Sequence, residues 1–141
     1  MNSFVIDASV AVKWFIPDAA VETDVDRAIQ LLTSAQRDEI RFLQPSHWVS
    51  EVAAVLVRLA PKTVGSSVEA LMALAFVKTA NDVGHYQRAI SLALKLDHHL
   101  SDTLYHAVAL EEKATLVTAD RKYYEKARRM GSILMLEEFD G

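Results

Sequence analysis

The sequence lacks cysteine altogether, and its 141 residues include only three prolines and four glycines. Without cysteine the fold has no disulfides or thiolate metal sites, and nothing requires an oxidising compartment, so we expect a cytoplasmic protein. The prolines and glycines are scattered, and no stretch is repetitive or polar enough for a linker or disordered tail. Hydrophobic residues make up 51% of the chain, which is enough to close one core. We therefore predict a single domain over residues 1–141.

Long hydrophobic runs and an excess of positive charge are also missing. The apolar runs are too short to cross a bilayer, and the chain reaches a carboxylate at Asp7, too early for a signal peptide, so we expect no membrane association. The formal net charge of -4 argues against a general nucleic-acid coat, because phosphate binding normally rests on clustered Lys and Arg. An enzyme that reaches phosphates through bound metal cations can still be acidic, because the ions supply the local positive charge.

Short β-rich runs and segments of helical spacing follow one another along the chain. Strands are expected at residues 3–6, 41–43, 114–118 and 133–135. Helices are expected at residues 10–15, around 29–32, from about 47 to 60, from 64 to near 81, and at 86–96, 101–110 and 121–129. Pro17 and Pro61 end the first and third of these helices. This order predicts an α/β fold with a parallel sheet.

Two aspartates follow predicted strands directly. Asp7 comes after the first strand, and Asp120 comes shortly after the strand at 114–118. In open parallel sheets, ligands gather beyond the carboxyl ends of the strands, so these two carboxylates converge if their strands are neighbours. Each could instead simply cap the helix that follows it, which for either residue alone is the simpler explanation.

Two further acids lie on predicted helices. The helical neighbours of Glu51 include Trp48, Ala54 and Val55, so Glu51 occupies an apolar face and requires a partner, which could be a cation, Arg58 or a histidine. Asp102 follows Ser101 at a helix start, where the helix dipole alone favours an acid.

The argument for function rests on the four acids as a set. Acids gathered together without positive residues repel one another, and hard cations such as Mg²⁺ or Mn²⁺ remove that repulsion. Two such ions about 4 Å apart can activate a water and stabilise the leaving oxygen of a phosphodiester. The sequence contains no glycine-rich phosphate loop, nucleophile elbow or cysteine nucleophile that would support another chemistry.

The segments around these acids resemble those of the PIN-domain nucleases, most closely the VapC-type toxins of toxin–antitoxin pairs. The resemblance covers nearly the whole chain and keeps the family's order, spacing and strand or helix context. It is carried by residues 4–9 (FVIDAS), 45–52 (PSHWVSEV), 100–105 (LSDTLY) and 116–120 (LVTAD). Lys122 stands where the family often carries a further acid.

The resemblance implies a three-layer α/β/α domain, a Mg²⁺- or Mn²⁺-dependent endoribonuclease, a homodimer and inhibition by a cognate antitoxin protein. It also implies roles for individual residues. The residues expected to hold metal are Asp7, Glu51, Asp102 and Asp120. Ser9 and Thr118 are expected to orient carboxylates or water. Lys13, Arg121 and Lys122 are further candidates for phosphate contact, although solvated helix residues need no function.

Several alternatives stay open at this point. His98, His99, Asp102 and His106 could share a helix face and bind a transition metal, a site that would prefer Zn²⁺ or Ni²⁺. A receiver-like Mg²⁺-binding signalling module would require adjacent acids at the first strand end, whereas Asp7 lies between Ile6 and Ala8. The fold could also be a catalytically inactive PIN-like binding protein. We expect Trp14, Phe15 and Trp48 to pack in the core, because aromatic residues at helical spacing usually do. The alternative is that they line an antitoxin groove or a dimer interface.

Overall fold

The computed structural model describes residues 1–16, 18 and 22–140. Its strands are β1 (Asn2–Ile6), β2 (Ile40–Gln44), β3 (Val77–Thr79), β4 (Thr115–Thr118) and β5 (Ile133–Met135). Its α-helices are α1 (Ala8–Ala11), α2 (Val25–Gln36), α3 (Trp48–Leu59), α4 (Val64–Met72), α5 (Val83–Leu96), α6 (Leu100–Glu111) and α7 (Arg121–Ala127). Short 3₁₀ turns follow α1, α7 and β5. Pro17, the expected end of the first helix, lies outside the described residues.

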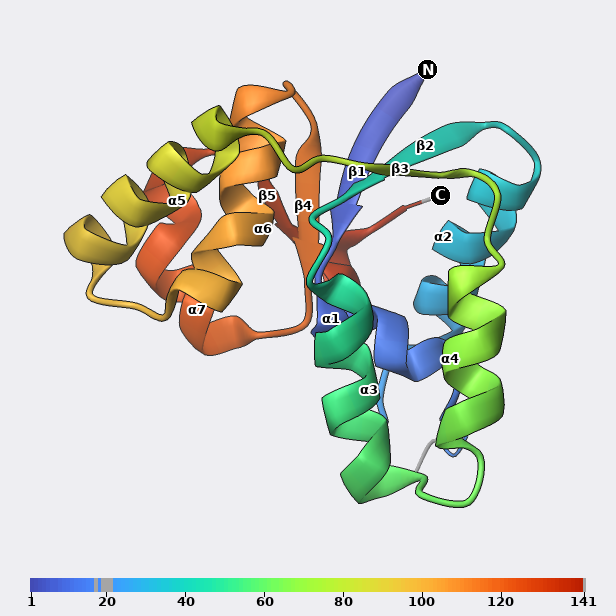
Figure 1. Cartoon of the computed structure of the whole chain (residues 1–141). Coiled ribbons are helices and arrows are strands. Elements are labelled where there is room, and N and C mark those ends of the chain that lie inside the picture. Colours follow the sequence, from blue (N-terminus) through green and yellow to red (C-terminus); the bar gives the residue numbers. More distant parts are fainter. Residues whose placement is uncertain (17, 19–21, 141) are drawn as a thin grey trace.

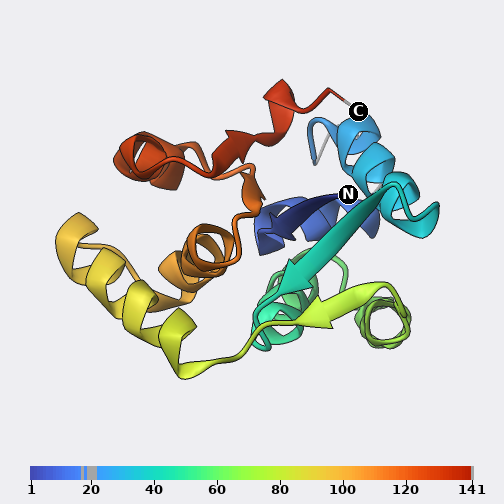
Figure 2. The ribbon, with the colours of Figure 1, turned by 90° about the horizontal axis from the view of Figure 1, so that it is seen from above.

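The strands form one five-stranded parallel sheet in the order β3-β2-β1-β4-β5. Helices α5, α6 and α7 lie on one side of the sheet, and α1, α2 and α4 lie on the other (Figures 1 and 2). This arrangement confirms the predicted three-layer α/β/α fold. Strand β1 has β2 on one side and β4 on the other, so the direction of the chain connections changes beside β1, where ligand sites of open sheets form.

The two strands that precede Asp7 and Asp120 are neighbours, as the convergence of these acids requires. Ile6 of β1 is in register with Val117 of β4, and the Asp7 backbone N–H continues this pairing by donating to the Val117 carbonyl at 3.0 Å. Both strands therefore end at the same edge of the sheet.

The main core lies between the sheet and the helices. Val5 and Val117 are fully buried, as expected for parallel strands covered on both faces. The Trp14 ring stacks on Phe42 with centroids 5.9 Å apart, and Trp48 is buried against Trp14, so these aromatic residues serve the core. Within the described residues, no helix combines the length and the apolar composition needed to cross a membrane.

Strand β3 was not predicted from the sequence. The helix expected from residue 64 to near 81 ends at Met72, and residues 77–79 pair instead with the edge of β2, where Phe42 is in register with Val77. A three-residue strand offers too little period-2 pattern to be recognised, and its formation depends on the edge that β2 presents.

Candidate active site

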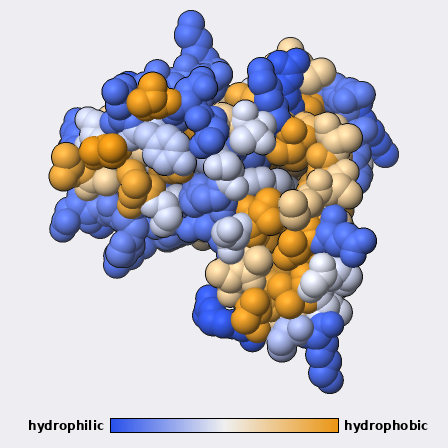
Figure 3. Space-filling view, in the orientation of Figure 1, coloured by the Kyte–Doolittle hydropathy of each residue, from blue (hydrophilic) through white to orange (hydrophobic). Residues whose placement is uncertain are grey.

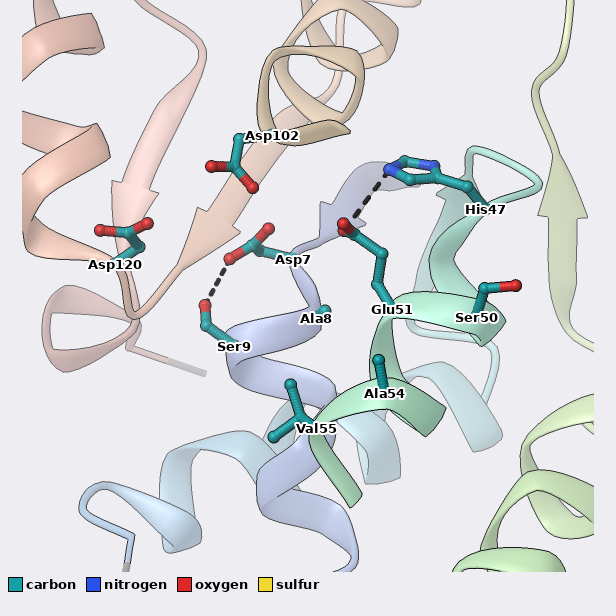
Figure 4. A pocket seen from close by; sticks show the side chains of 10 residues that line it. All are labelled: Asp7, Ala8, Ser9, His47, Ser50, Glu51, Ala54, Val55, Asp102 and Asp120. Carbon is teal, nitrogen blue, oxygen red and sulfur yellow. Dashed lines mark hydrogen bonds and ion pairs between the residues drawn. The ribbon is translucent and has the colours of Figure 1, made fainter. Parts of the chain in front are cut away.

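All four acids that were predicted to hold metal line a single cavity of about 560 Å³ beyond the carboxyl ends of β1 and β4. In Figure 4, Asp7 lies at the centre, with Glu51 on one side and Asp102 and Asp120 on the other. The remaining lining residues are Ala8, Ser9, His47, Ser50, Ala54 and Val55. The fold therefore brings together side chains from the end of β1, from α3, from α6 and from the loop between β4 and α7.

Ser9 and Thr118 both hold the Asp7 carboxylate. The Ser9 hydroxyl donates to Asp7 Oδ2 at 2.5 Å, and the Thr118 hydroxyl donates to the same oxygen at 3.1 Å. Each hydroxyl also accepts a backbone N–H at 3.0 Å: Ser9 Oγ accepts from Ala119 across the site, and Thr118 Oγ1 accepts from Asp120 two residues further along its own segment. These bonds fix the Asp7 side chain and connect the ends of β1 and β4.

The backbone that carries Asp7 is held by a buried glutamine. Gln44 Oε1 accepts the N–H of Ile6 at 2.7 Å, and Gln44 Nε2 donates to the Ile6 carbonyl at 2.8 Å. The main-chain pairing of β1 with β2 ends at Phe4 and Phe42. Beyond that pair, the Gln44 side chain bonds the backbone of Ile6 in place of a main-chain partner. Gln44 is fully buried, so these bonds form away from water.

Helix capping explains one of the strand-end acids but not the other. The Asp120 carboxylate caps α7 by accepting the backbone N–H of Tyr123 at 3.1 Å. Asp7 occupies the equivalent position before α1, yet its side chain accepts no capping bond and bonds Ser9 and Thr118 instead. The position of the Asp7 carboxylate therefore needs another explanation.

A histidine is the protein partner of Glu51. His47 Nε2 lies 3.4 Å from Glu51 Oε1 and also donates to the Ser101 carbonyl at 2.7 Å. Burial raises the pKa of Glu51, but the bond and charge of His47 outweigh it, so the pKa lies below its usual value. For His47, burial lowers the pKa, and its bonds to Glu51 and Ser101 more than offset that effect. Glu51 is half-buried and faces the cavity, so its surroundings are less apolar than the helix pattern suggested.

Asp102 is also paired with a histidine. His98 Nε2 lies 2.8 Å from Asp102 Oδ2, and His98 Nδ1 lies 3.2 Å from Lys126 Nζ. A lysine ammonium can only donate, so Lys126 donates to His98 Nδ1, and His98 Nε2 faces Asp102. Asp102 lies in the first turn of α6, as expected, and its orientation is set by His98.

The cavity is negatively charged and weakly compensated. Burial, together with the charges of Asp102 and Glu51, raises the pKa of Asp7 to about 6, although bonds from Ser9 and Thr118 act in the opposite direction. Among the described residues, no Lys or Arg forms an ion pair with any of the four acids. The contacts of His47 with Glu51 and of His98 with Asp102 are the ion-pair contacts that these carboxylates make among the described residues.

These oxygen donors fit a hard divalent cation. Within the described part of the chain, no group of three or more His, Cys, Asp or Glu side chains is close enough together to hold a metal ion by itself. Mg²⁺ does not require such a cage, because it keeps several waters and is usually held by one or two carboxylates together with substrate phosphates. An open cavity lined by four acids suits this mode of binding.

The histidine-rich alternative is not supported by the arrangement of the side chains. His106 Nδ1 lies 2.9 Å from the Tyr123 hydroxyl and His106 Nε2 lies 2.8 Å from the Gly131 carbonyl, so both ring nitrogens are used away from His98. His98 and His99 form an edge contact with ring centroids 5.8 Å apart. Three ligands from this set therefore do not meet at one point.

The three candidates for phosphate contact have different surroundings. Lys13 is buried and donates to Glu22 and to the Thr23 carbonyl, so this prediction is wrong for Lys13, whose ammonium is already used inside the fold. Arg121 forms ion pairs with Glu125 and Glu137. Lys122 is exposed and lines a second cavity, of about 300 Å³, together with Asp97, His98, His99 and Lys126.

The histidine that the sequence allowed as a partner of Glu51 is His47, whereas Tyr105, also near the acids, was not singled out from the sequence. His47 immediately precedes α3, four residues before Glu51, and Tyr105 lies on α6, one turn after Asp102. Helical spacing of three or four residues from a candidate acid is the signal that could have identified both.

The sequence of this chain matches a known protein family, and its fold matches solved structures. A family model described as the PIN domain matches residues 4–129. The chain therefore belongs to the PIN domain family, which confirms the resemblance found in its sequence. The sequence matches no curated protein. The PIN match also argues against the receiver-like alternative.

Three solved structures have a similar fold at low sequence identity. A toxin–antitoxin complex from Klebsiella pneumoniae matches with a TM-score of 0.67 and 14% identity, over 96% of this chain and 98% of that one. Mycobacterium tuberculosis VapC20, described as a sarcin–ricin loop cleaving toxin, matches with a TM-score of 0.63 and 14% identity, over 82% of this chain and 87% of that one. VapBC2 from Rickettsia felis, bound to a DNA fragment from its promoter, matches with a TM-score of 0.63 and 16% identity, over 94% of this chain and 96% of that one.

Proposed function

We propose that the protein is a Mg²⁺- or Mn²⁺-dependent endoribonuclease that acts as the toxin of a toxin–antitoxin pair, with its machinery in a single domain. The observation that carries this proposal is the meeting of four carboxylates, from four separate segments, in one cavity without a Lys or Arg partner. Membership of the PIN family supports nuclease chemistry, and the likeness of the fold to VapC20 supports a toxin.

The four acids would share one role, and the hydroxyl groups beside Asp7 would have another. Asp7, Glu51, Asp102 and Asp120 would hold the cation, which supplies Lewis acidity for hydrolysis of the phosphodiester. The Ser9 and Thr118 hydroxyls fix the carboxylate of Asp7, so it need not reorganise when a ligand enters.

Positive charge beside the cavity provides a place for the RNA backbone. Lys122 lies two residues after Asp120 on α7, is exposed, and has no ion pair with a described residue. Lys126, one turn further on, lines the same second cavity and is linked through His98 to Asp102. A phosphate adjacent to the scissile one can therefore bind Lys122 while the acids hold the reacting group.

Two exposed apolar surfaces provide positions for protein partners (Figure 3). The first is a groove between α3 and α4, lined by residues that include Val49, Met72 and Leu74. Ser46 and Thr79 also line this groove, and a concave groove that combines apolar and polar side chains suits a segment of an antitoxin. The second is a stripe along α5 formed by Val83, Tyr86, Ile90 and Leu94. A narrow stripe on one helix face can pair with its own copy about a two-fold axis, as a homodimer requires.

The experiment that tests the function is cleavage of a labelled single-stranded RNA by the purified protein with Mg²⁺, Mn²⁺ or EDTA. Asp7→Asn should abolish metal-dependent cleavage while the circular dichroism spectrum stays unchanged. Lys122→Ala should raise KM and leave kcat nearly unchanged. Asp38→Asn is the control, because Asp38 is exposed and its positive φ of 58° is readily adopted by asparagine.

The possible results separate the proposal from its alternatives. Full activity of Asp7→Asn would contradict the assigned role of Asp7. No cleavage by the wild-type protein, with Mn²⁺ binding retained, would favour a catalytically inactive binding protein. A preference for Zn²⁺ or Ni²⁺ would instead point to the histidine-rich segment.

A further inference from the structure

The imidazole of His47 connects two helices that carry acids of the cavity. His47 immediately precedes α3 and lines the cavity, with 24% of its side chain exposed. Its Nε2 atom lies 2.7 Å from the carbonyl oxygen of Ser101, in the first turn of α6, and 3.4 Å from Glu51 Oε1 on α3. A carbonyl oxygen can only accept, so Nε2 carries a proton and donates it to Ser101. The ring therefore links the start of α3 with the start of α6.

The second ring nitrogen shows that packing alone does not explain a histidine at this position. His47 Nδ1 is buried and has no hydrogen-bond partner among the described residues. The ring packs on the Tyr105 ring, with centroids 4.8 Å apart. Buried polar atoms without a partner are uncommon, because each costs free energy of desolvation. An apolar side chain would avoid this cost, so we look to Nε2 for the role of His47.

The two groups that Nε2 approaches belong to the two acids supplied by α3 and α6. Glu51 is one of these acids, and Ser101 directly precedes the other, Asp102. The 2.7 Å contact with Ser101 is the stronger of the two, and the 3.4 Å contact with Glu51 is the weaker one. Figure 4 shows Glu51 and Asp102 on opposite sides of Asp7, with His47 directed at Glu51. One N–H donor thus restrains both sides of the cavity.

We propose that His47 is a positioning residue that ties α6 to α3 through the Ser101 carbonyl and so sets the separation of Glu51 and Asp102 across the cavity. This inference rests on the proposed function. Neither ring nitrogen is free to bind a cation, because Nδ1 is buried and the proton on Nε2 is already donated to Ser101. His47 therefore acts through the two acids, although it lines the cavity.

The first experiment examines the link between the helices in EDTA, without metal. A long-range proton–nitrogen NMR spectrum of the histidine rings should show a proton on Nε2 of His47. The variant His47→Leu keeps an apolar contact with Tyr105 and removes the donor. The backbone amides of Asp102 and Thr103 donate to the His99 carbonyl at 3.1 and 3.2 Å. In His47→Leu their hydrogens should exchange about fivefold faster, as expected for the loss of one hydrogen bond. An Nε2 atom without a proton, or unchanged exchange, would overturn the proposal.

The second experiment measures the affinity for Mn²⁺ by isothermal titration calorimetry. Loss of a group that orients metal-binding side chains typically weakens metal binding by about 10- to 100-fold, and His47→Leu should show a loss of this size. His47→Gln restores an N–H donor at about the reach of Nε2, so its affinity should return close to that of the wild-type protein. Unaltered affinity in His47→Leu, or an equal loss in His47→Gln, would contradict the role of His47.

His85→Leu is the matched control. His85 Nε2 lies 3.1 Å from Glu112 Oε2 and so joins α5 to the end of α6, but neither residue lines the acidic cavity. This variant should have a lower Tm and the Mn²⁺ affinity of the wild-type protein. The same pattern in His47→Leu would mean that His47 is merely structural. Failure of the wild-type protein to bind Mn²⁺ at all would instead refute the proposed function, and the exchange rates in EDTA would still test the link between α3 and α6.

Discussion

At Asp7, burial and the neighbouring acids favour the protonated carboxyl group, whereas the bonds from Ser9 and Thr118 favour the carboxylate. Its side chain accepts two hydroxyl bonds, yet burial and neighbouring acids still raise its pKa to about 6. In the unfolded chain an aspartate titrates near pH 4. Between about pH 4 and pH 6, Asp7 is therefore protonated in the metal-free folded protein and ionised in the unfolded chain.

This difference predicts a pH-dependent stability of the metal-free protein. Because the folded state binds more protons between about pH 4 and pH 6, stability falls as pH rises through this range, by about 3 kcal/mol at most for Asp7. Asp7→Asn should therefore raise the Tm in EDTA at pH 7.5 and have little effect at pH 4.5. Thermal unfolding of both proteins at the two pH values measures this, with Asp38→Asn as the control. An equal effect at both pH values would show that Asp7 is not desolvated.

At the scale of elements, the site depends on how the strands end. β1 and β4 stop side by side and deliver Asp7 and Asp120 to the same edge, while α3 and α6 supply the other two acids. The bonds from Ser9 Oγ to Ala119 and from Thr118 Oγ1 to Asp7 connect the ends of β1 and β4, and the Gln44 side chain connects β1 with β2. The position of Asp7 is thus defined from both neighbouring strands.

Gln44→Ala should destabilise the protein by about 2–4 kcal/mol, because the N–H and the carbonyl of Ile6 both lose a buried partner. Urea unfolding measures the change in free energy. The exposed Gln36 at the end of α2 provides the control variant Gln36→Ala, for which a change within about 0.5 kcal/mol is expected. Equal stability of the two variants would mean that water replaces the Gln44 bonds.

The whole molecule combines an acidic cavity with apolar surfaces on separate helices. Met72, at the groove between α3 and α4, is 71% exposed, and Leu94 on the α5 stripe is 80% exposed. Exposed apolar side chains gathered in this way commonly mark protein interfaces. In the proposed arrangement the α5 stripe serves a second copy and the groove serves the antitoxin.

Sedimentation equilibrium distinguishes these two surfaces. The wild-type protein should have the mass of a dimer, and Leu94→Asp should be monomeric, because a charge on the α5 stripe cannot be desolvated in the interface. Met72→Asp should remain dimeric and keep the same circular dichroism spectrum. A dimer that persists in Leu94→Asp, or that dissociates in Met72→Asp, would contradict this assignment of the α5 stripe.

Several of the strands and the candidate site residues can be predicted from the sequence alone. The β-rich runs at 3–6 and 114–118 predict two of the strands, because such runs fit a buried sheet whatever surrounds them. The predicted site residues Asp7, Glu51, Asp102 and Asp120 are recognisable from their places at strand ends and helix faces, and the resemblance to PIN-domain nucleases gives them a common role. These features are local, and local pattern is what a sequence displays directly.

Tertiary structure alone determined the remaining features. Strand β3 exists because the edge of β2 accepts it, and Lys13 is unavailable to phosphate because Glu22 and Thr23 surround its ammonium. Of the partners that the sequence left open for Glu51, the structure gives a histidine, His47; it also gives His98 to Asp102 and leaves the Tyr105 hydroxyl unpaired. Burial and pairing depend on contacts between residues that are distant along the chain or on different turns, and these contacts are decided only when the layers pack together.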